Sequence, residues 1–193
     1  AVKLLLTEEN VSYNGAYYQF ENVTIEPRPE NYFTVWIAGG SRTPDPLSPD
    51  QPYMVKSVLN RIAKHADVFT CRASGNTEWV ARDFQTVRTH LQSVGRDPAT
   101  LELAHVQAGY VVDTADSNKA LSIQRKPMET IMGHNRDWDH LQECYLVGSI
   151  DDIVEKLKFL ENHGLEHVTI QPAGPEMEQL DLWMDKIIEP FFR

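Results

Sequence analysis

Four short apolar runs recur along the chain, and segments with helical periodicity separate them. The runs are rich in β-branched and aromatic residues and lack strict alternation of apolar and polar positions. Such runs are typical of strands that are buried on both faces of a parallel sheet. They predict strands at residues 33–38, 66–70, 101–112 and 167–171.

Between the predicted strands, apolar residues recur at the spacing of an amphipathic helix. The clearest case is residues 77–94, which Thr77 can cap and Gly95 can close. A second clear helix begins at the cap Ser149 and ends at Gly164. Further helices are predicted at residues 53–65, 117–123 and 177–188.

Three other segments have a different character. Residues 1–6 are typical of the end of a helix, and residues 11–28 predict a short hairpin with a turn at Asn14-Gly15. The proline-rich residues 44–52 predict an exposed loop. Residues 126–145 are polar and predict a long functional loop with irregular helix.

The order of elements is strand and helix in regular alternation, which predicts an α/β fold with parallel strands and right-handed crossovers. Four such units are compatible with an open doubly wound sheet. They are equally compatible with half of an eight-stranded barrel.

Composition narrows the class of protein. The chain has 193 residues, 41% hydrophobic and 24% charged, with a net charge of −10. The negative charge argues against nucleic acid as a partner. No apolar run reaches the ~20 residues of a membrane span, and no secretory signal is visible at the start. We therefore expect a cytoplasmic protein that does not bind membranes.

Candidate metal and thiol chemistry is sparse in the sequence. The seven histidines show no HExxH spacing, and Cys71 and Cys144 have no near partner. A metal site is therefore not expected. The two cysteines are interpreted as reduced, partly buried thiols, and His105, inside a predicted strand, as a core histidine.

The most informative segment is Thr34-Val-Trp-Ile-Ala-Gly-Gly-Ser-Arg-Thr43. An apolar run ends there in paired glycines followed by hydroxyl and cationic side chains. Glycines let a backbone approach an anion closely, and backbone amides and hydroxyls can donate to it. The segment is typical of a phosphate-binding loop. The alternative is that the glycines only permit a tight turn between strand and helix.

Four ordered blocks resemble the bacterial-luciferase-like superfamily of flavin monooxygenases and F420-dependent oxidoreductases, over its C-terminal half only. Val35-Trp-Ile-Ala-Gly-Gly-Ser41, after Pro29, is similar to the fifth barrel strand and its loop. Residues 61–69 resemble the next helix end and strand, and Gly95-Arg-Asp-Pro98 the turn before strand seven. The last block, residues 146–154 with 167–174, resembles the last helix and strand eight.

The resemblance implies a fold and a cofactor. The whole chain, residues 1–193, is expected to form one partial domain, strands 5–8 of a TIM (β/α)8 barrel, without the N-terminal half. In this family the loop after strand five holds the phosphate of FMN or, alternatively, of F420. Carried over, that loop comprises Gly39, Gly40, Ser41, Arg42 and Thr43.

The resemblance also implies a substrate pocket at the carboxyl ends of the strands. Its expected residues are Arg72, His134, Trp138 and Gln171. His134 and Trp138 fall in the segment where the family keeps a mobile lid. Solvated loop polarity is the alternative for that segment, and a surface position the alternative for Gln171. No catalytic residue is identified.

Two functions remain open. The first is a flavin-dependent oxidoreductase, a monooxygenase acting with reduced flavin and O2 on a small organic substrate. It would need a complementary N-terminal half or a homo-oligomer, because a half-barrel exposes strand edges, and possible partners include a flavin reductase. The second is a non-catalytic flavin-binding or scaffold subunit. An independent flavodoxin-like domain is a third, weaker interpretation.

Overall fold

The computed structural model describes residues 1–31, 33–41, 53–72, 75–133 and 136–192. The chain divides into two compact units, Ala1–Thr34 and Val35–Arg193. The proline-rich residues 44–52, predicted as an exposed loop, lie outside the described residues.

The first unit consists of a short helix and a hairpin. Helix α1 spans Val2–Thr7, and strands β1 (Val11–Asn14) and β2 (Gln19–Val23) pair antiparallel. Asn14 pairs with Gln19, so the connection has four residues, 15–18, and is longer than the tight turn predicted at Asn14-Gly15. A hydrogen bond from the Gly15 amide to the Tyr18 carbonyl, 3.0 Å, closes it.

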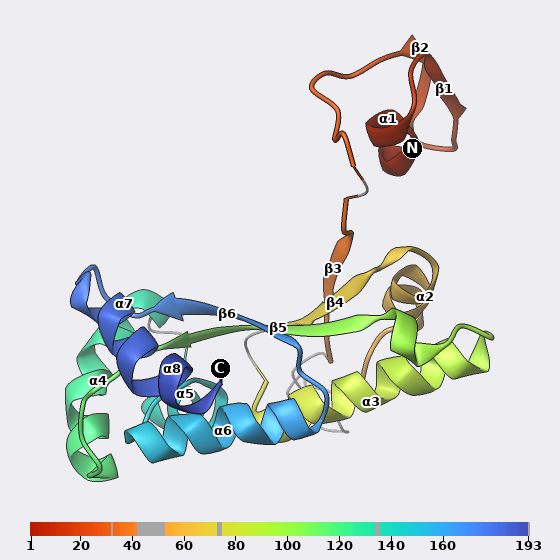
Figure 1. Ribbon diagram of the computed structural model, residues 1–193. Helices are drawn as coiled ribbons and strands as arrows, with labels where there is room; N and C mark the ends of the chain where they lie inside the picture. Colours follow the sequence, from red (N-terminus) through yellow and green to blue (C-terminus); the bar gives the residue numbers. More distant parts are fainter. Residues whose placement is uncertain (32, 42–52, 73–74, 134–135, 193) are drawn as a thin grey trace. The chain divides into compact units, whose positions relative to one another are not determined.

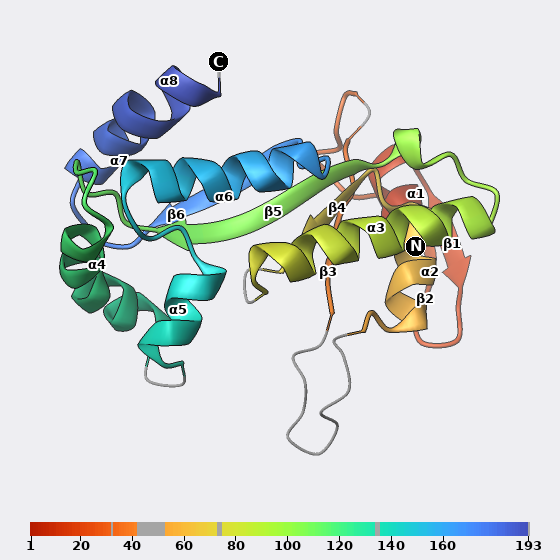
Figure 2. The ribbon, with the colours of Figure 1, turned by 90° about the horizontal axis from the view of Figure 1, so that it is seen from below.

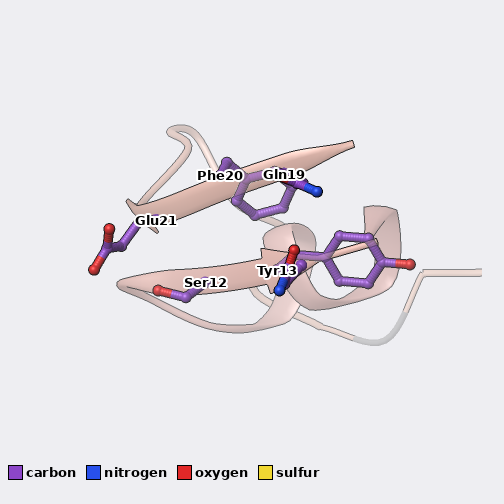
Figure 3. A pocket seen from close by; sticks show the side chains of 6 residues that line it. Ser12, Tyr13, Gln19, Phe20 and Glu21 are labelled. Atoms are coloured by element: carbon purple, nitrogen blue, oxygen red, sulfur yellow. The ribbon is translucent and has the colours of Figure 1, made fainter. Parts of the chain in front are cut away.

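A shallow cleft of about 450 Å³ lies on this hairpin (Figure 3). Tyr13 and Phe20 stack across the two strands with ring centroids 5.7 Å apart. This cross-strand pair fixes the register of the hairpin. None of the residues expected at the functional site lies in this unit.

The second unit is built on one parallel sheet. Its strands are β3 (Trp36–Gly39), β4 (Val68–Cys71), β5 (Glu102–Gly109) and β6 (His167–Pro172). They pair side by side in chain order, β3-β4-β5-β6, with every pairing parallel (Figure 1). All four predicted strands are confirmed, with β5 shorter than expected.

Helices connect and follow the strands. They are α2 (Lys56–His65), α3 (Thr77–Ser93), the short 3₁₀ turn Pro98–Thr100, α4 (Ser117–Met132), α5 (Trp138–Cys144), α6 (Ile150–Asn162), α7 (Glu178–Trp183), the π-helical turn Met184–Ile188 and α8 (Glu189–Phe191). Helices α3 and α6 lie side by side along one face of the sheet (Figures 1 and 2). Among the described helices, none combines the length and apolar character that a membrane crossing requires.

The core lies between the sheet and these helices. Phe69 of β4 and Leu103 of β5 pack against Phe84 and Leu91 of α3, with Leu160 of α6 in the same cluster. All five side chains are almost completely buried. Burial of apolar area at ~25 cal/mol per Å² makes this contact the main stabilising force of the unit.

The opposite face of the sheet is concave. Ala38, Thr70, Ala104 and His167 form one row across the four strands, and Trp36 lies on the same face. Three strand spacings of ~4.8 Å would separate β3 from β6 by ~14 Å in a flat sheet. The rings of Trp36 and His167 nevertheless lie 5.5 Å apart, so the sheet curls toward this face.

Residues 126–145, predicted as a long loop with irregular helix, are mostly regular helix in the structure. Helix α4 continues through Pro127 to Met132, and α5 begins at Trp138 after the cap Asp137. The proline and the polar composition concealed the helix, because the buried contacts that stabilise it, such as Met128, come from tertiary packing.

Of the two helix caps predicted from the sequence, the structure confirms that of α6 and differs at that of α3. The capping box at Ser149 is confirmed: its hydroxyl accepts from the Asp152 amide, and the Asp152 carboxylate accepts from the Ser149 amide. Helix α3 is capped by Asn76 rather than by Thr77, since the Asn76 side chain accepts from the Trp79 amide at 2.9 Å.

Candidate functional site

The loop that follows β3 contains the predicted phosphate-binding glycines. Gly40 has φ +143°, in the region that favours glycine, and a Cβ atom there would lie 2.8 Å from Cγ of Arg72. A Cβ on Gly39 would lie 2.8 Å from a methyl of Val58. Both glycines are therefore required by backbone conformation or space. Arg42 and Thr43, the last two predicted residues of the loop, lie outside the described residues.

Ser41 forms hydrogen bonds with Asp83, a residue that was not expected at the site. Its backbone amide donates to Oδ2 of Asp83 at 2.7 Å, and its hydroxyl donates to Oδ1 of the same carboxylate. Asp83 lies on α3 and is 3% exposed. A signal was present, because Asp83 is three residues after Val80 and next to Phe84, inside the apolar stripe of the helix.

Arg72 lies against this loop. Its backbone amide donates to the Gly39 carbonyl at 3.0 Å, and its Nη1 donates to the Ser41 carbonyl at 3.2 Å. The side chain is exposed and passes over Gly40. The guanidinium, expected in the substrate pocket, donates to the loop, and its charge also acts on Tyr145.

Two further side chains at the end of β4 contribute to the site. The Cys71 thiol lies 3.6 Å from Oδ2 of Asp83, and burial, followed by the nearby Asp83 charge, raises its pKa well above the ordinary value. The thiol is therefore protonated and unreactive at neutral pH. The buried Thr70 hydroxyl has no hydrogen-bond partner in the part of the chain that the structure describes.

Gln171 lies elsewhere, on β6, where it lines a cleft of about 560 Å³. Helix α4 provides the facing wall with Lys126, Thr130 and Ile131, and Pro172 extends the β6 side. The cleft therefore combines an apolar lining with a few polar groups, as small-molecule sites do.

Trp138, at the start of α5, is half-buried against a core cluster that includes Ala173, two residues beyond Gln171. Near it, Arg136 donates to the hydroxyl of Tyr145 and lies 5.8 Å from the centre of that ring. Burial raises the pKa of Tyr145, whereas the Arg136 and Arg72 charges lower it. His134 lies outside the described residues.

The structure thus brings together Gly39, Gly40, Ser41 and Arg72, and it places Gln171 and Trp138 in a separate region of the second unit. His105 is a fully buried core residue, as predicted. Its Nδ1 lies 3.2 Å from the Cys71 carbonyl, and Gln107 Nε2 lies 2.8 Å from its Nε2. Among the described residues, no group of three or more His, Cys, Asp or Glu side chains is arranged to hold a metal ion.

Comparison with known proteins agrees with these observations. An F420-dependent glucose-6-phosphate dehydrogenase from Segniliparus rotundus is 23% identical over 193 aligned positions, which cover 90% of this chain and 52% of the relative. The chain therefore spans about half the length of this curated relative. No family model matches the chain.

Solved structures share the fold. An F420-dependent secondary alcohol dehydrogenase in complex with an F420-acetone adduct superposes with a TM-score of 0.73 at 14% identity, covering 99% of this chain and 58% of that chain. The monooxygenase RslO1 from Streptomyces bottropensis superposes with a TM-score of 0.69 at 17% identity, covering 98% of this chain and 58% of that chain. The chain resembles F420-dependent and luciferase-like enzymes in sequence and in fold.

The cofactors of these luciferase-like neighbours are the two that the sequence resemblance implies. F420 is named for the dehydrogenases. A riboflavin lyase with modified FMN superposes with a TM-score of 0.63 at 7% identity, covering 92% of this chain and 47% of that chain.

The described residues fit a cofactor phosphate at Gly40 and Arg72. The cationic Arg72 side chain passes over Gly40. Its stem and the Asp83 carboxylate occupy the side to which a Cβ would point, so a phosphate would approach the loop from another side. Ser41 cannot donate a hydrogen bond to the phosphate in this conformation, because its amide and hydroxyl already donate to Asp83. The partnerless Thr70 hydroxyl lies on the concave face, where a cofactor ring can accept its hydrogen bond.

Proposed function

We propose that this chain supplies the cofactor-phosphate loop of a luciferase-like oxidoreductase that uses FMN or F420. The observation that carries the proposal is the position of Gly39-Gly40-Ser41 at the carboxyl end of β3, in a parallel sheet whose strands follow chain order. Sites of TIM-barrel enzymes lie at this end of the strands.

The sheet would form strands 5–8 of a barrel. Doubly wound sheets reverse their strand order at a switch point, whereas this sheet keeps chain order from β3 to β6. The curl that brings Trp36 to His167 is also the curvature of a barrel wall. The concave face, which includes Trp36, Thr70 and Val106, would then be the barrel interior.

In this function, Gly40 and Arg72 hold the cofactor phosphate, with Arg42 and Thr43 as further donors. Reduced FMN would supply electrons for activation of O2 in a monooxygenase, and F420 would supply hydride transfer. The contribution of the chain is to bind and orient the cofactor and to exclude water from the concave face.

The substrate would be a small organic molecule in the cleft beside Gln171. The Gln171 amide can hydrogen-bond a substrate carbonyl or hydroxyl, and Ile131 and Pro172 supply apolar contact. Trp138 and His134 are proposed as further residues of the substrate pocket. Arg136, held against Tyr145, offers a positive charge there.

The activity would require a partner. A complementary N-terminal half, or a second copy of the chain, would pair the edge strands β3 and β6 and complete the barrel. A monooxygenase of this kind would also receive reduced flavin from a flavin reductase.

One observation favours the second candidate, a non-catalytic flavin-binding or scaffold subunit. The two donors of Ser41 are engaged by an internal carboxylate, so the loop offers a phosphate fewer donors than its sequence suggests. A subunit that has lost the chemistry could retain the fold with such a loop.

Binding titrations test the proposal. FMN and F420 are both fluorescent, so each can be titrated with the purified protein and the dissociation constant measured. We expect saturable binding of at least one of them, followed by turnover when the partner and substrate are present. Saturable binding without turnover in the complete assembly would favour the scaffold subunit, and no binding of either cofactor would contradict both functions.

A further inference from the structure

Asp83 is a buried charged residue without a role in the function proposed above. Its carboxylate receives the Ser41 amide at 2.7 Å, the Ser41 hydroxyl and the Cys71 thiol at 3.6 Å. These are the contacts by which a loop holds an oxyanion: a backbone amide and a hydroxyl converging on oxygen atoms of one anionic group. The loop after β3 therefore already holds an anion that belongs to the chain.

The position of this carboxylate affects any second anion at the loop. Oδ2 of Asp83 lies 3.2 Å from the place where a Cβ on Gly40 would be. Atoms of the Arg72 stem fill the same place, so a phosphate would reach the loop from another side and would lie near this negative charge without touching it. At a partly desolvated site, charges so close repel each other by amounts that alter an equilibrium constant tenfold or more.

We propose that Asp83 is a specificity-determining residue that weakens binding of a phosphate monoester at this loop. Its charge opposes the phosphate, and its hydrogen bonds remove both Ser41 donors from the phosphate's reach. Among the described residues at this site, only Gly40 and Arg72 then favour binding of the phosphate. The proposal deepens the proposed function and depends on the same cofactor loop.

The matched ligands FMN and riboflavin test this proposal, because they differ only in the phosphate. The ratio of their dissociation constants, riboflavin over FMN, isolates the contribution of the phosphate. We expect a ratio below about tenfold in the wild-type protein. In Asp83→Asn, which has the same shape without the charge, we expect the ratio to rise about tenfold.

A second Asp83 variant and a control variant complete the test. Asp83→Ser removes the charge and leaves space, so it should raise the ratio as well, even if Asp83→Asn does not fold. Asp152→Asn is the matched control: that carboxylate also accepts from a serine amide and hydroxyl, those of Ser149, but it lies at the start of α6. The control should leave the ratio unchanged.

The outcomes separate the inference from the proposed function. An unchanged or smaller ratio in the folded Asp83 variants, or a strong FMN preference in the wild-type protein, would overturn the role of Asp83 and leave cofactor binding intact. Failure of the wild-type protein and of both Asp83 variants to bind either flavin, together with failure to bind F420, would overturn the inference and the proposed function together.

Discussion

At the scale of single residues, the proposed phosphate site depends on glycines that no other residue can replace in the loop after β3. Gly40 has a positive φ, and the atoms around it, from Arg72 and Asp83, leave no room for a Cβ. A phosphate site of this kind depends on close approach to the backbone. Its residues should therefore respond to substitution more strongly than equally exposed glycines elsewhere.

Gly40→Asp should lower the affinity for FMN or F420 by more than tenfold. The new carboxylate would meet the cofactor phosphate and would lie beside Asp83. Gly95→Ala is the matched control: Gly95 also has a positive φ, +78°, but no atom lies within 4 Å of its would-be Cβ. The control should cost about 1 kcal/mol of stability and leave the affinity unchanged. Equal affinity for wild-type and Gly40→Asp proteins would exclude this loop as the phosphate site.

His105 should make stability depend on pH. Burial lowers its pKa from 6.5 to about 4 in the folded protein, although the Cys71 carbonyl opposes that shift. The unfolded chain therefore binds the proton more readily. The stabilisation is complete above about pH 6.5 and is lost as pH falls toward 4, by about 3 kcal/mol in total.

Urea unfolding at several pH values checks this dependence. His105→Gln should remove most of the slope between pH 6.5 and 4, whereas the exposed His163→Gln should retain it. An identical slope in wild-type protein and His105→Gln would show that another group carries the pH dependence.

At the scale of elements, strands formed by local apolar runs could be predicted from the sequence. Helical segments that are stabilised by contacts with residues distant in sequence could not. The β-branched runs predicted all four strands of the sheet, because such runs are typical of parallel strands. Helix α4 was expected to end near Ile123, because Pro127 and polar residues follow. In the structure, Met128 is fully buried and the helix continues to Met132.

At the candidate site, too, local sequence patterns could be recognised, whereas a contact between distant residues could not. Gly39, Gly40 and Ser41 are adjacent in sequence, so their pattern was readable. The contact between Ser41 and Asp83 joins residues 42 positions apart, through the packing of α3 against the end of β3. No local pattern specifies such a contact, although a carboxylate inside an apolar helix stripe indicated that Asp83 needs a buried partner.

Ser149→Ala should destabilise the second unit by about 1–2 kcal/mol. The substitution removes the capping box of α6, in which the Ser149 hydroxyl accepts from the Asp152 amide. Ser122→Ala, at an exposed serine whose hydroxyl donates to the Lys119 carbonyl, should change stability by less than about 0.5 kcal/mol. Chemical denaturation of both variants provides the comparison, and equal losses would show that the cap contributes nothing specific.

At the scale of the whole molecule, the concave face of the sheet is the feature that the described residues leave uncovered. Trp36 is 46% exposed and Val106 is 38% exposed on this face, which also includes Thr70 and His167. The chain also covers only 52% and 58% of the F420-dependent enzymes it resembles. In the proposed barrel this face is the interior, so under that proposal we expect it to be closed when the enzyme is active.

Native mass spectrometry of the purified protein shows whether the chain belongs to a larger, cofactor-binding assembly. We expect a mass above the 22.0 kDa of the chain, which dissociates in the gas phase into a second polypeptide, or a second copy, and one molecule of FMN or F420. A bare 22.0 kDa monomer that takes up neither cofactor when they are added would exclude the proposed function.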